Sequence, residues 1–385
     1  MRLTTFTALA LASAALVACG PGTGEITGGT GAGSSTSSAS TGGNGGSGGE
    51  SSSSTSSSSG TGGAGGVPGA WCAPIPACDT APPDPGPAQP WTHDIASPII
   101  VATGDPNHRG RDLYLNPGDP QWIIAKFAYG LADKDLKDEK VDIYLLRDCG
   151  SAWEKLGTAV TTQEDAHASV EGVDDSGGRV YFQIPPDKAL APGRHRAHLV
   201  VQGDLSSTDV FIEVVPPHAP MFVTDVDGTL TDSENAEFGA LLTGSLPGVH
   251  PDAAKAFGIL VSKGYHPMYV TARPEWLVQR TRELLDTNAF PPGVVHTTLG
   301  LTGATGSAAA TYKTDEMALL ATKGLLPAWA FGNTATDAEA YENGMIMPVD
   351  HRIFYQFDDT MFGGRRIESY TDLLAEVSAL PSLCP

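Results

Sequence analysis

The C-terminal half of the chain alternates short apolar runs with longer segments of helical character. The apolar runs of strand length include Met221–Thr224, His266–Val270 and Trp329–Gly332. Helices are expected after the first two runs, because Pro251 and Pro274 stand where a helix prefers proline, at its start. This alternation predicts an α/β domain over residues 217–385, with a parallel sheet covered by helices on both faces.

Residues 91–216 have a different pattern, in which β-branched or alternating runs are separated by Gly, Asp, Ser and Pro. The expected strands are Val141–Leu146, Arg179–Ile184, Arg194–Val201 and Val210–Val215. Such spacing is typical of an antiparallel sandwich of the immunoglobulin-like kind. The sequence therefore predicts an all-β sandwich domain in front of the α/β domain.

The N-terminal segment has neither pattern. A basic residue precedes an apolar run that ends in Leu16-Val17-Ala18-Cys19, which predicts a lipoprotein signal peptide over residues 1–18 and a lipidated Cys19. An ordinary signal peptide with a chance cysteine is the alternative. Residues 19–66 are almost all Gly, Ser and Thr and predict a disordered tether, followed by a Pro-rich, Cys-containing linker at 67–90. On this interpretation the protein is an exported bacterial lipoprotein, anchored on a periplasmic or cell-surface membrane face.

The remaining cysteines are Cys72, Cys78, Cys149 and Cys384. An even number in an exported chain indicates disulfides, and three pairings are possible. Cys72 and Cys78 are close in sequence, and Cys149 with Cys384 would then fix the C-terminus to the β-domain. A zinc site is the alternative, although no histidine spacing favours it.

A net charge of −21 argues against nucleic acid as a partner and against adhesion to anionic lipid by bulk electrostatics. A phosphorylated lipid substrate would therefore need local positive charge. The candidates for a basic rim are Arg273, Lys313, Arg352, Arg365 and Arg366. For the last three, ordinary solvated surface charge is the better interpretation.

Candidate chemistry begins where the apolar run 221–224 ends. Asp225 and Asp227 follow it, and on a strand-like path side chains two residues apart point to the same side. Two adjacent carboxylates repel each other unless one is protonated or a cation lies between them. Mg²⁺, which prefers oxygen ligands, would remove that conflict. An acidic loop that only caps a helix is the alternative.

Two further motifs contain groups that suit a phosphoryl ligand. Thr271 ends the second apolar run, where its hydroxyl either binds a phosphoryl oxygen or caps the next helix. Lys313 is expected at the start of a helix, with Asp315 and Glu316 in its first turn. A lysine is unfavourable at that end of the helix dipole, so a functional reason is favoured over a surface charge.

Asn333 and Asp337 follow the apolar run 329–332, and their oxygens lie about one helical turn apart, which suits a hard cation. Each consecutive pair of motifs is separated by about one strand and one helix. This leaves no room for a large cap domain, so the site is expected to be open to a bulky substrate.

The four motifs resemble those of haloacid-dehalogenase (HAD) type phosphatases, whose nucleophile motif D-x-D-G-T-[LV]-[ST] fits every position of Asp225–Thr231. Together with Tyr269–Pro274 and Phe331–Tyr341, they look like the lipin-type HAD domain of Mg²⁺-dependent phosphatidate phosphatases. The same domain type ends the membrane-associated phosphatidylinositol-transfer proteins of the retinal-degeneration-B type. Ala125–Gly130 and Val200–Asp204 resemble the β-domain that precedes it there, so the resemblance covers roughly residues 95–375.

The resemblance implies a Rossmannoid HAD-like fold and a role for each motif residue. Asp225 would be the nucleophile, Asp227 the general acid/base, and Thr271, Arg273 and Lys313 would bind the phosphoryl group. The implied Mg²⁺ ligands are Asp225, Asp227, Asn333 and Asp337. The transfer proteins usually lack the nucleophile aspartate, whereas this chain retains it.

The leading hypothesis is thus a Mg²⁺-dependent HAD phosphatase acting on a phosphomonoester, with phosphatidate as the lipid candidate. The first alternative is a phosphatidate-binding or sensing module with little or no turnover. The second is a β-domain that serves as a cell-surface interaction module, with the HAD domain as a scaffold.

Overall fold

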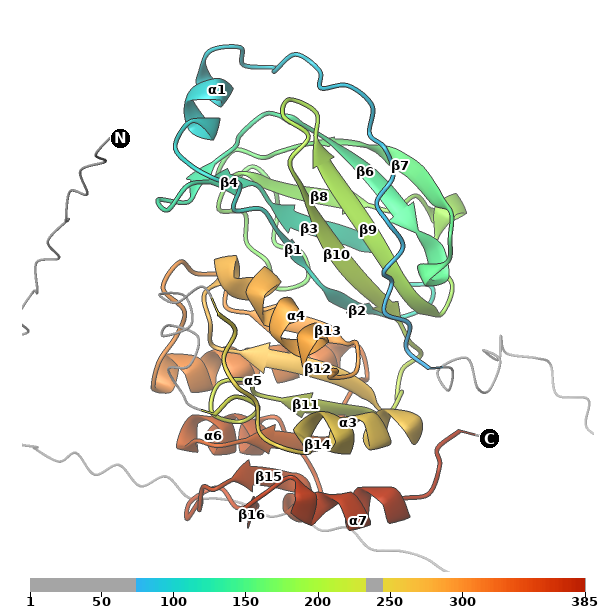
Figure 1. The fold of residues 1–385 in the computed structure, drawn as a ribbon, viewed down its shortest axis with the longest axis vertical. Coiled ribbons are helices and arrows are strands. Elements are labelled where there is room, and N and C mark those ends of the chain that lie inside the picture. The colour runs from blue at the N-terminus through green and yellow to red at the C-terminus, as the bar shows by residue number, and fades with distance from the viewer. Residues whose placement is uncertain (1–73, 233–244, 385) are drawn as a thin grey trace, which may run out of the picture. The chain divides into compact units, whose positions relative to one another are not determined.

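The computed structural model describes residues 74–232 and 245–384. The predicted signal peptide, Cys19 and the tether lie outside these residues, as does Cys72. The described chain forms an all-β sandwich domain followed by an α/β domain (Figure 1). The predicted fold class is therefore confirmed.

The sandwich domain contains a three-stranded sheet, a five-stranded sheet and a short hairpin. The three-stranded sheet has the order β1-β3-β8, formed by Arg109–Arg111, Trp122–Lys126 and Arg179–Gln183. The five-stranded sheet has the order β2-β10-β9-β6-β7, formed by Leu113–Leu115, Ser207–Val214, Gly193–Val201, Lys140–Leu146 and Trp153–Val160. The hairpin pairs β4 (Ala128–Tyr129) with β5 (Lys134–Asp135), and α1 (Ala96–Val101) precedes all strands. Apolar side chains of both larger sheets form one core, which includes Ile123, Val180, Leu199 and Ile212.

The α/β domain is built on six parallel strands in the order β13-β12-β11-β14-β15-β16. These strands are Val294–Thr297, His266–Thr271, Met221–Thr224, Pro327–Gly332, Arg352–Tyr355 and Arg365–Ile367. The helices are α3 (Ala253–Ser262), α4 (Val278–Thr287), α5 (Ser307–Thr322), α6 (Ala335–Asn343) and α7 (Thr371–Ala379). Short 3-10 helices occupy Arg147–Cys149, Pro186–Lys188, Glu275–Leu277 and Val349–His351.

The central strand β11 is buried on both faces, because its side chains alternate between two cores. Phe222 packs in the core that includes side chains of α3, α4 and α7. Met221 and Val223 pack in the opposite core, with side chains of α5 and α6. The first predicted motif therefore follows a strand whose position is fixed from both faces of the sheet.

One expected helix boundary is wrong. Helix α5 begins at Ser307, so Lys313 lies nearly two turns inside it rather than at its start. The three alanines 308–310 are strong helix formers and extend the helix toward its N-terminus. The misfit with the helix dipole, from which a function of Lys313 was inferred, is therefore absent.

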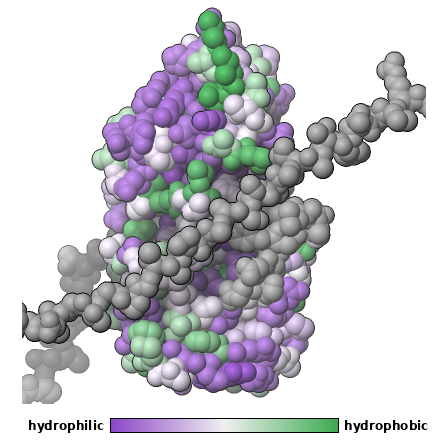
Figure 2. Space-filling model, turned by 90° about the vertical axis from the view of Figure 1, so that its left-hand side faces the viewer, coloured by the Kyte–Doolittle hydropathy of each residue, from purple (hydrophilic) through white to green (hydrophobic). Residues whose placement is uncertain are grey.

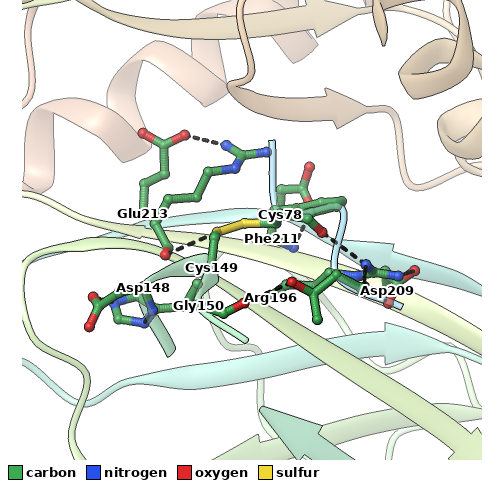
Figure 3. The surroundings of a disulfide bond; sticks show 12 residues. Cys78, Asp148, Cys149, Gly150, Arg196, Asp209, Phe211 and Glu213 are labelled. Carbon is green, nitrogen blue, oxygen red and sulfur yellow. Dashed lines mark hydrogen bonds and ion pairs between the residues drawn. A yellow bond between two sulfur atoms is a disulfide. The ribbon is translucent and has the colours of Figure 1, made fainter. Parts of the chain in front are cut away.

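The predicted disulfide pairing is also wrong, because Cys78 bonds to Cys149 across 71 residues of sequence. Cys384 is disulfide-bonded too, and not to Cys149 as predicted. Figure 3 shows the Cys78–Cys149 bond beside Arg196 and Asp209. Arg196 donates to the Cys78 and Thr80 carbonyls and pairs with Asp209, so the Pro-rich segment is fixed along the five-stranded sheet. Closeness in sequence did not decide the pairing, since strand geometry brings Cys149 to this segment.

The surface is mainly hydrophilic on the face that Figure 2 shows, with separate apolar groups. Two of the more exposed apolar side chains are Ile99 of helix α1 and Ile95, the residue just before that helix. Within the described ranges, no helix combines the length and hydrophobicity that a membrane span requires.

Candidate functional site

The loop that carries Asp225 and Asp227 closes on itself through its own sequence. Gly228 has a φ of +71°, which favours glycine, and its N–H donates to the Thr231 hydroxyl at 3.0 Å. The Asp225 N–H donates to the carbonyl of Phe331 on the neighbouring strand β14. The D-x-D-G-T-x-T spacing thus fixes both aspartates at the carboxyl end of β11, the edge of a parallel sheet where ligands bind.

Lys313 joins two buried carboxylates of the site. Its Nζ lies 2.6 Å from Asp225 Oδ1 and also donates to Asp337 Oδ1. Burial raises the pKa of Asp225 to about 7, although the charge of Lys313 opposes that rise. Burial would lower the pKa of Lys313, but the charges of Asp225 and Asp337 raise it above its usual value. The lysine is therefore a fixed positive charge beside the expected nucleophile.

Asp337 is fully buried and has a structural role at the start of α6. Its Oδ2 accepts hydrogen bonds from the N–H groups of Asn333 and Thr334 and from the Thr334 hydroxyl. Thr334 and Asp337 together form a capping box. The sequence left open whether Asp337 caps the start of a helix. In the structure it does so and also contacts Lys313.

Three oxygen atoms converge beside the Lys313 ion pairs. Thr229 Oγ1 lies 3.1 Å from Asp225 Oδ2 and 2.8 Å from Asn333 Oδ1. A hydroxyl has one hydrogen, so it can donate to only one of these two acceptors. Carboxylate and amide oxygens are ligands that a hard cation such as Mg²⁺ prefers. Asp225 and Asn333 therefore fit Mg²⁺, and Thr229 is a site residue that the sequence reasoning did not single out.

The other two predicted metal ligands have different partners in this structure. Asp337 is occupied by Lys313 and the α6 cap, and Asp227 is bound by Arg273 and Thr271. Within residues 74–232 and 245–384, no three His, Cys, Asp or Glu side chains are grouped so that they could hold a metal. A Mg²⁺ site here would depend on the amide oxygen of Asn333 as well as on carboxylate.

Arg273 forms a two-pronged ion pair with Asp227. Its Nη2 lies 2.8 Å from Asp227 Oδ1, and its Nε lies 2.9 Å from Oδ2. Thr271 donates to Asp227 Oδ2 at 3.0 Å and accepts from the Arg273 N–H. Thr271 is completely buried, so the described contacts of its hydroxyl support the Asp227–Arg273 pair.

A cavity of about 330 Å³ opens onto these groups. Asp225, Asp227, Arg273 and Lys313 line it, together with residues at the N-terminal ends of α5 and α6. Helix N-termini attract anions, because their first N–H groups lack partners within the helix. The cavity therefore combines a carboxylate, a fixed lysine charge and two helix ends, a set that suits a phosphoryl group.

The rest of the expected basic rim is elsewhere. Arg352 is buried and donates to the carbonyls of Ile346 and Phe362. Arg365 pairs with Glu376, and Arg366 pairs with Asp358 and Glu368. None of these three arginines lines the cavity. Solvated charge was the favoured interpretation for all three, and it is wrong for Arg352, which holds the loop before β15.

Comparison with known proteins identifies both domains. Residues 106–214 match the β-sandwich domain of PITM 1-3, and residues 222–355 match the LNS2 domain of PITM 1-3. Among the relatives is protein retinal degeneration B of Drosophila melanogaster, 32% identical over 197 residues, or 51% of this chain and 14% of the relative. Human membrane-associated phosphatidylinositol transfer protein 1 is 32% identical over 198 residues, with the same two coverages. Human transfer protein 3 is 29% identical over 197 residues, or 51% of this chain and 18% of the relative.

These matches confirm the resemblance to the lipin-type domain of retinal-degeneration-B type proteins. The chain spans only about a seventh to a fifth of the length of these relatives. All three relatives are animal proteins, and the two human ones are named as membrane-associated transfer proteins, which contradicts the predicted exported bacterial lipoprotein. The signal peptide and the lipidated Cys19 have no support in these matches. A short apolar run before a cysteine is a weak pattern, and here it misled the prediction of localisation.

Proposed function

We propose that the chain, with its LNS2 domain and the preceding β-sandwich domain, is a Mg²⁺-dependent phosphatase of the HAD type that hydrolyses a phosphomonoester. Phosphatidate is the candidate lipid substrate, since the relatives are named for phospholipid transfer. The observation that carries this proposal is the placement of Asp225 on the cavity wall, 2.6 Å from the fixed charge of Lys313. A carboxylate nucleophile beside a buried cation is the arrangement that attack on a phosphoryl group requires.

Asp225 and Lys313 would act together in the first step. The Asp225 carboxylate attacks phosphorus, the bond from phosphorus to the leaving oxygen breaks, and an aspartyl-phosphate forms. Lys313 offsets the negative charge that remains on the phosphoryl oxygens. Asp225 and Asn333 would hold Mg²⁺, which supplies Lewis-acid polarisation of those oxygens. Thr229 contacts both the Asp225 and the Asn333 side chains and so fixes their positions relative to each other.

Asp227 would transfer the protons. The leaving alkoxide takes up a proton from Asp227, and Asp227 later accepts one from the water that hydrolyses the aspartyl-phosphate. In this structure the carboxyl group of Asp227 is held in an ion pair with Arg273. For the first role Asp227 must be protonated, so its hold by Arg273 has to loosen when substrate enters.

The same ion pair favours a second candidate function, a phosphatidate-binding module with little or no turnover. If the Arg273–Asp227 pair stays intact when a phosphomonoester binds beside Lys313, Asp227 is held away from the leaving group and turnover does not follow. The names of the human relatives, which refer to transfer rather than hydrolysis, agree with this alternative.

The test is phosphate release by the purified full chain from p-nitrophenyl phosphate and from phosphatidate vesicles, with Mg²⁺ or with EDTA. Asp225→Asn is the matched control, because the amide has nearly the same shape and is no nucleophile. Release that requires both Mg²⁺ and Asp225 supports the phosphatase. Vesicle binding that depends on Lys313, without release, supports the binding module. Release that is indifferent to EDTA and to Asp225→Asn would exclude this site.

A further inference from the structure

Strand β1 directs two arginines from the sandwich domain toward the α/β domain. Arg109 and Arg111 are two residues apart on a strand, so they leave it on the same side. Both are buried, at 3% and 5% exposure. Gly110 between them lies against β10, where a Cβ atom would be 2.1 Å from the Asp209 carbonyl oxygen. The triplet therefore packs closely on its own domain, where the Nη atoms of Arg109 also pair with Asp133, while each arginine reaches a carboxylate of the α/β domain.

Arg109 reaches the loop that follows Thr271. Its Nε lies 3.0 Å from Glu275 Oε2, and Arg179 on β8 holds the same carboxylate at 2.9 and 3.2 Å. Glu275 is two residues from Arg273, and only Pro274 separates them. Two buried sandwich arginines thus fix the segment whose arginine holds Asp227.

Arg111 reaches the helix that carries Lys313. It pairs with Glu316 and donates to the carbonyl of Thr297 at 3.1 Å. Glu316 lies three residues after Lys313, on the same face of α5, and both side chains are buried. His296 contacts the second oxygen of Glu316 at 2.6 Å, so this carboxylate is held on both sides.

Stability alone is a poor explanation for so many buried charges. Removing a buried ion pair from water costs several kcal/mol per ion, and hydrophobic residues of similar volume are often as stabilising. What ion pairs with several hydrogen bonds provide is a single fixed geometry. The ion pairs of Glu275 and Glu316 therefore fix the two segments that carry Arg273 and Lys313. Both of these side chains line the cavity.

We propose that the β-sandwich domain is part of the phosphoryl-binding site. Arg109 and Arg179 position Arg273 through Glu275, and Arg111 positions Lys313 through Glu316. These five are positioning residues, and their assignment rests on the proposed function of the cavity.

The test compares Glu275→Gln and Glu316→Gln with Glu213→Gln in the full chain. Glu213 is a matched control, because it is equally buried, pairs with Arg194 and crosses the same domain boundary to His266. His266 begins β12, whereas Thr271 ends it, so the control lies about 16 Å from the site along that strand. Arg179→Lys and Arg111→Lys keep the charge but lose the two-pronged contact, and they serve if a glutamine variant does not fold.

Two readouts are taken at a temperature where every variant is folded. Turnover of p-nitrophenyl phosphate should fall at least about tenfold in kcat for Glu275→Gln and Glu316→Gln, and stay within about twofold for Glu213→Gln. Amide hydrogen exchange should rise at residues 271–277 in Glu275→Gln and at 307–316 in Glu316→Gln, and at neither segment in the control. Equal effects of all three variants on both readouts would overturn the proposal. If the unsubstituted protein shows no turnover, only the proposed phosphatase function is refuted. The hydrogen-exchange measurement still tests whether Glu275 and Glu316 position the two segments.

Discussion

Arg273 and Asp227 form an ion pair at the mouth of the cavity, with contacts of 2.8 and 2.9 Å between guanidinium and carboxylate. Both side chains line the same space as Asp225. The residue expected to supply a proton is therefore held by Arg273 until another group competes for that arginine. A phosphoryl group, which accepts two-pronged contacts from arginine as a carboxylate does, is such a competitor.

Asp227→Asn should separate substrates by their leaving groups. Alkyl phosphates need a proton on the leaving oxygen, so their kcat/KM should fall by at least about 100-fold. p-Nitrophenyl phosphate has a leaving group that departs without a proton. The decrease in kcat/KM for this substrate should therefore be at least about tenfold smaller than the decrease for alkyl phosphates. The measurement is the ratio of the two kcat/KM values in variant and parent. Equal losses on both substrates would mean that Asp227 does not protonate the leaving group.

Lys313→Met should destabilise the fold strongly. It would leave Asp225 and Asp337 buried without a cation between them, which costs about 3–5 kcal/mol of unfolding free energy. Urea unfolding measures the change, with Lys255→Met on the exposed face of α3 as the control, expected to stay within about 0.5 kcal/mol. Adding Asp337→Asn to Lys313→Met should recover part of the loss. A double variant that is no more stable than Lys313→Met would contradict the charge argument.

The sequence predicted the parts of the site that repeat a local rule. Asp225, Thr271 and Asn333 each lie at or just after the carboxyl end of a strand of one parallel sheet, and such ends meet at one edge, so these three could be expected together. No such local rule predicts which side chains from distant segments contact each other. Nothing near Arg273 in the sequence indicates that it pairs with Asp227, and nothing near Arg109 indicates Glu275.

The cysteines and the N-terminal segment show the same limit. The Cys78–Cys149 pair depends on which strand end lies beside the Pro-rich segment, and that is a property of the folded sandwich. The sequence pattern was informative for the fold class, because alternating runs and βα spacing extend over many residues. It misled for localisation, where a four-residue pattern carried the inference.

Acid should weaken the contact between the two domains through Glu316. Burial alone would raise its pKa, but Arg111 and His296 lower it to about 2, against an ordinary value of 4.5. A lowered pKa in the folded state stabilises the fold above pH 4.5, and that stabilisation is lost as the pH falls toward 2. The loss should be roughly 3 kcal/mol. Unfolding free energies of parent and Glu316→Gln, measured between pH 6 and about 2.5, should converge as the pH falls. Parallel curves would refute the assignment.

The Cys78→Ser/Cys149→Ser double variant should lose stability but retain function. Closing a loop of 71 residues is worth about 4 kcal/mol on chain-entropy grounds. Urea unfolding without reductant measures the loss. Phosphate release should be unaffected at temperatures where the variant is folded, because neither cysteine lines the cavity. A change in release without a change in stability would show an unexpected link between the Pro-rich segment and the site.

The triplet Arg109-Gly110-Arg111 ties the sandwich domain to the α/β domain through two buried ion pairs that start from three consecutive residues. A sandwich borrowed from another protein would leave Glu275 and Glu316 as buried charges with no partner from β1. A side chain at Gly110 would displace both arginines at once. A chimaera that joins the sandwich domain of one homologue to the α/β domain of another should therefore function only when that sandwich domain contains this triplet. The triplet is thus a practical marker for choosing which chimaeras to build.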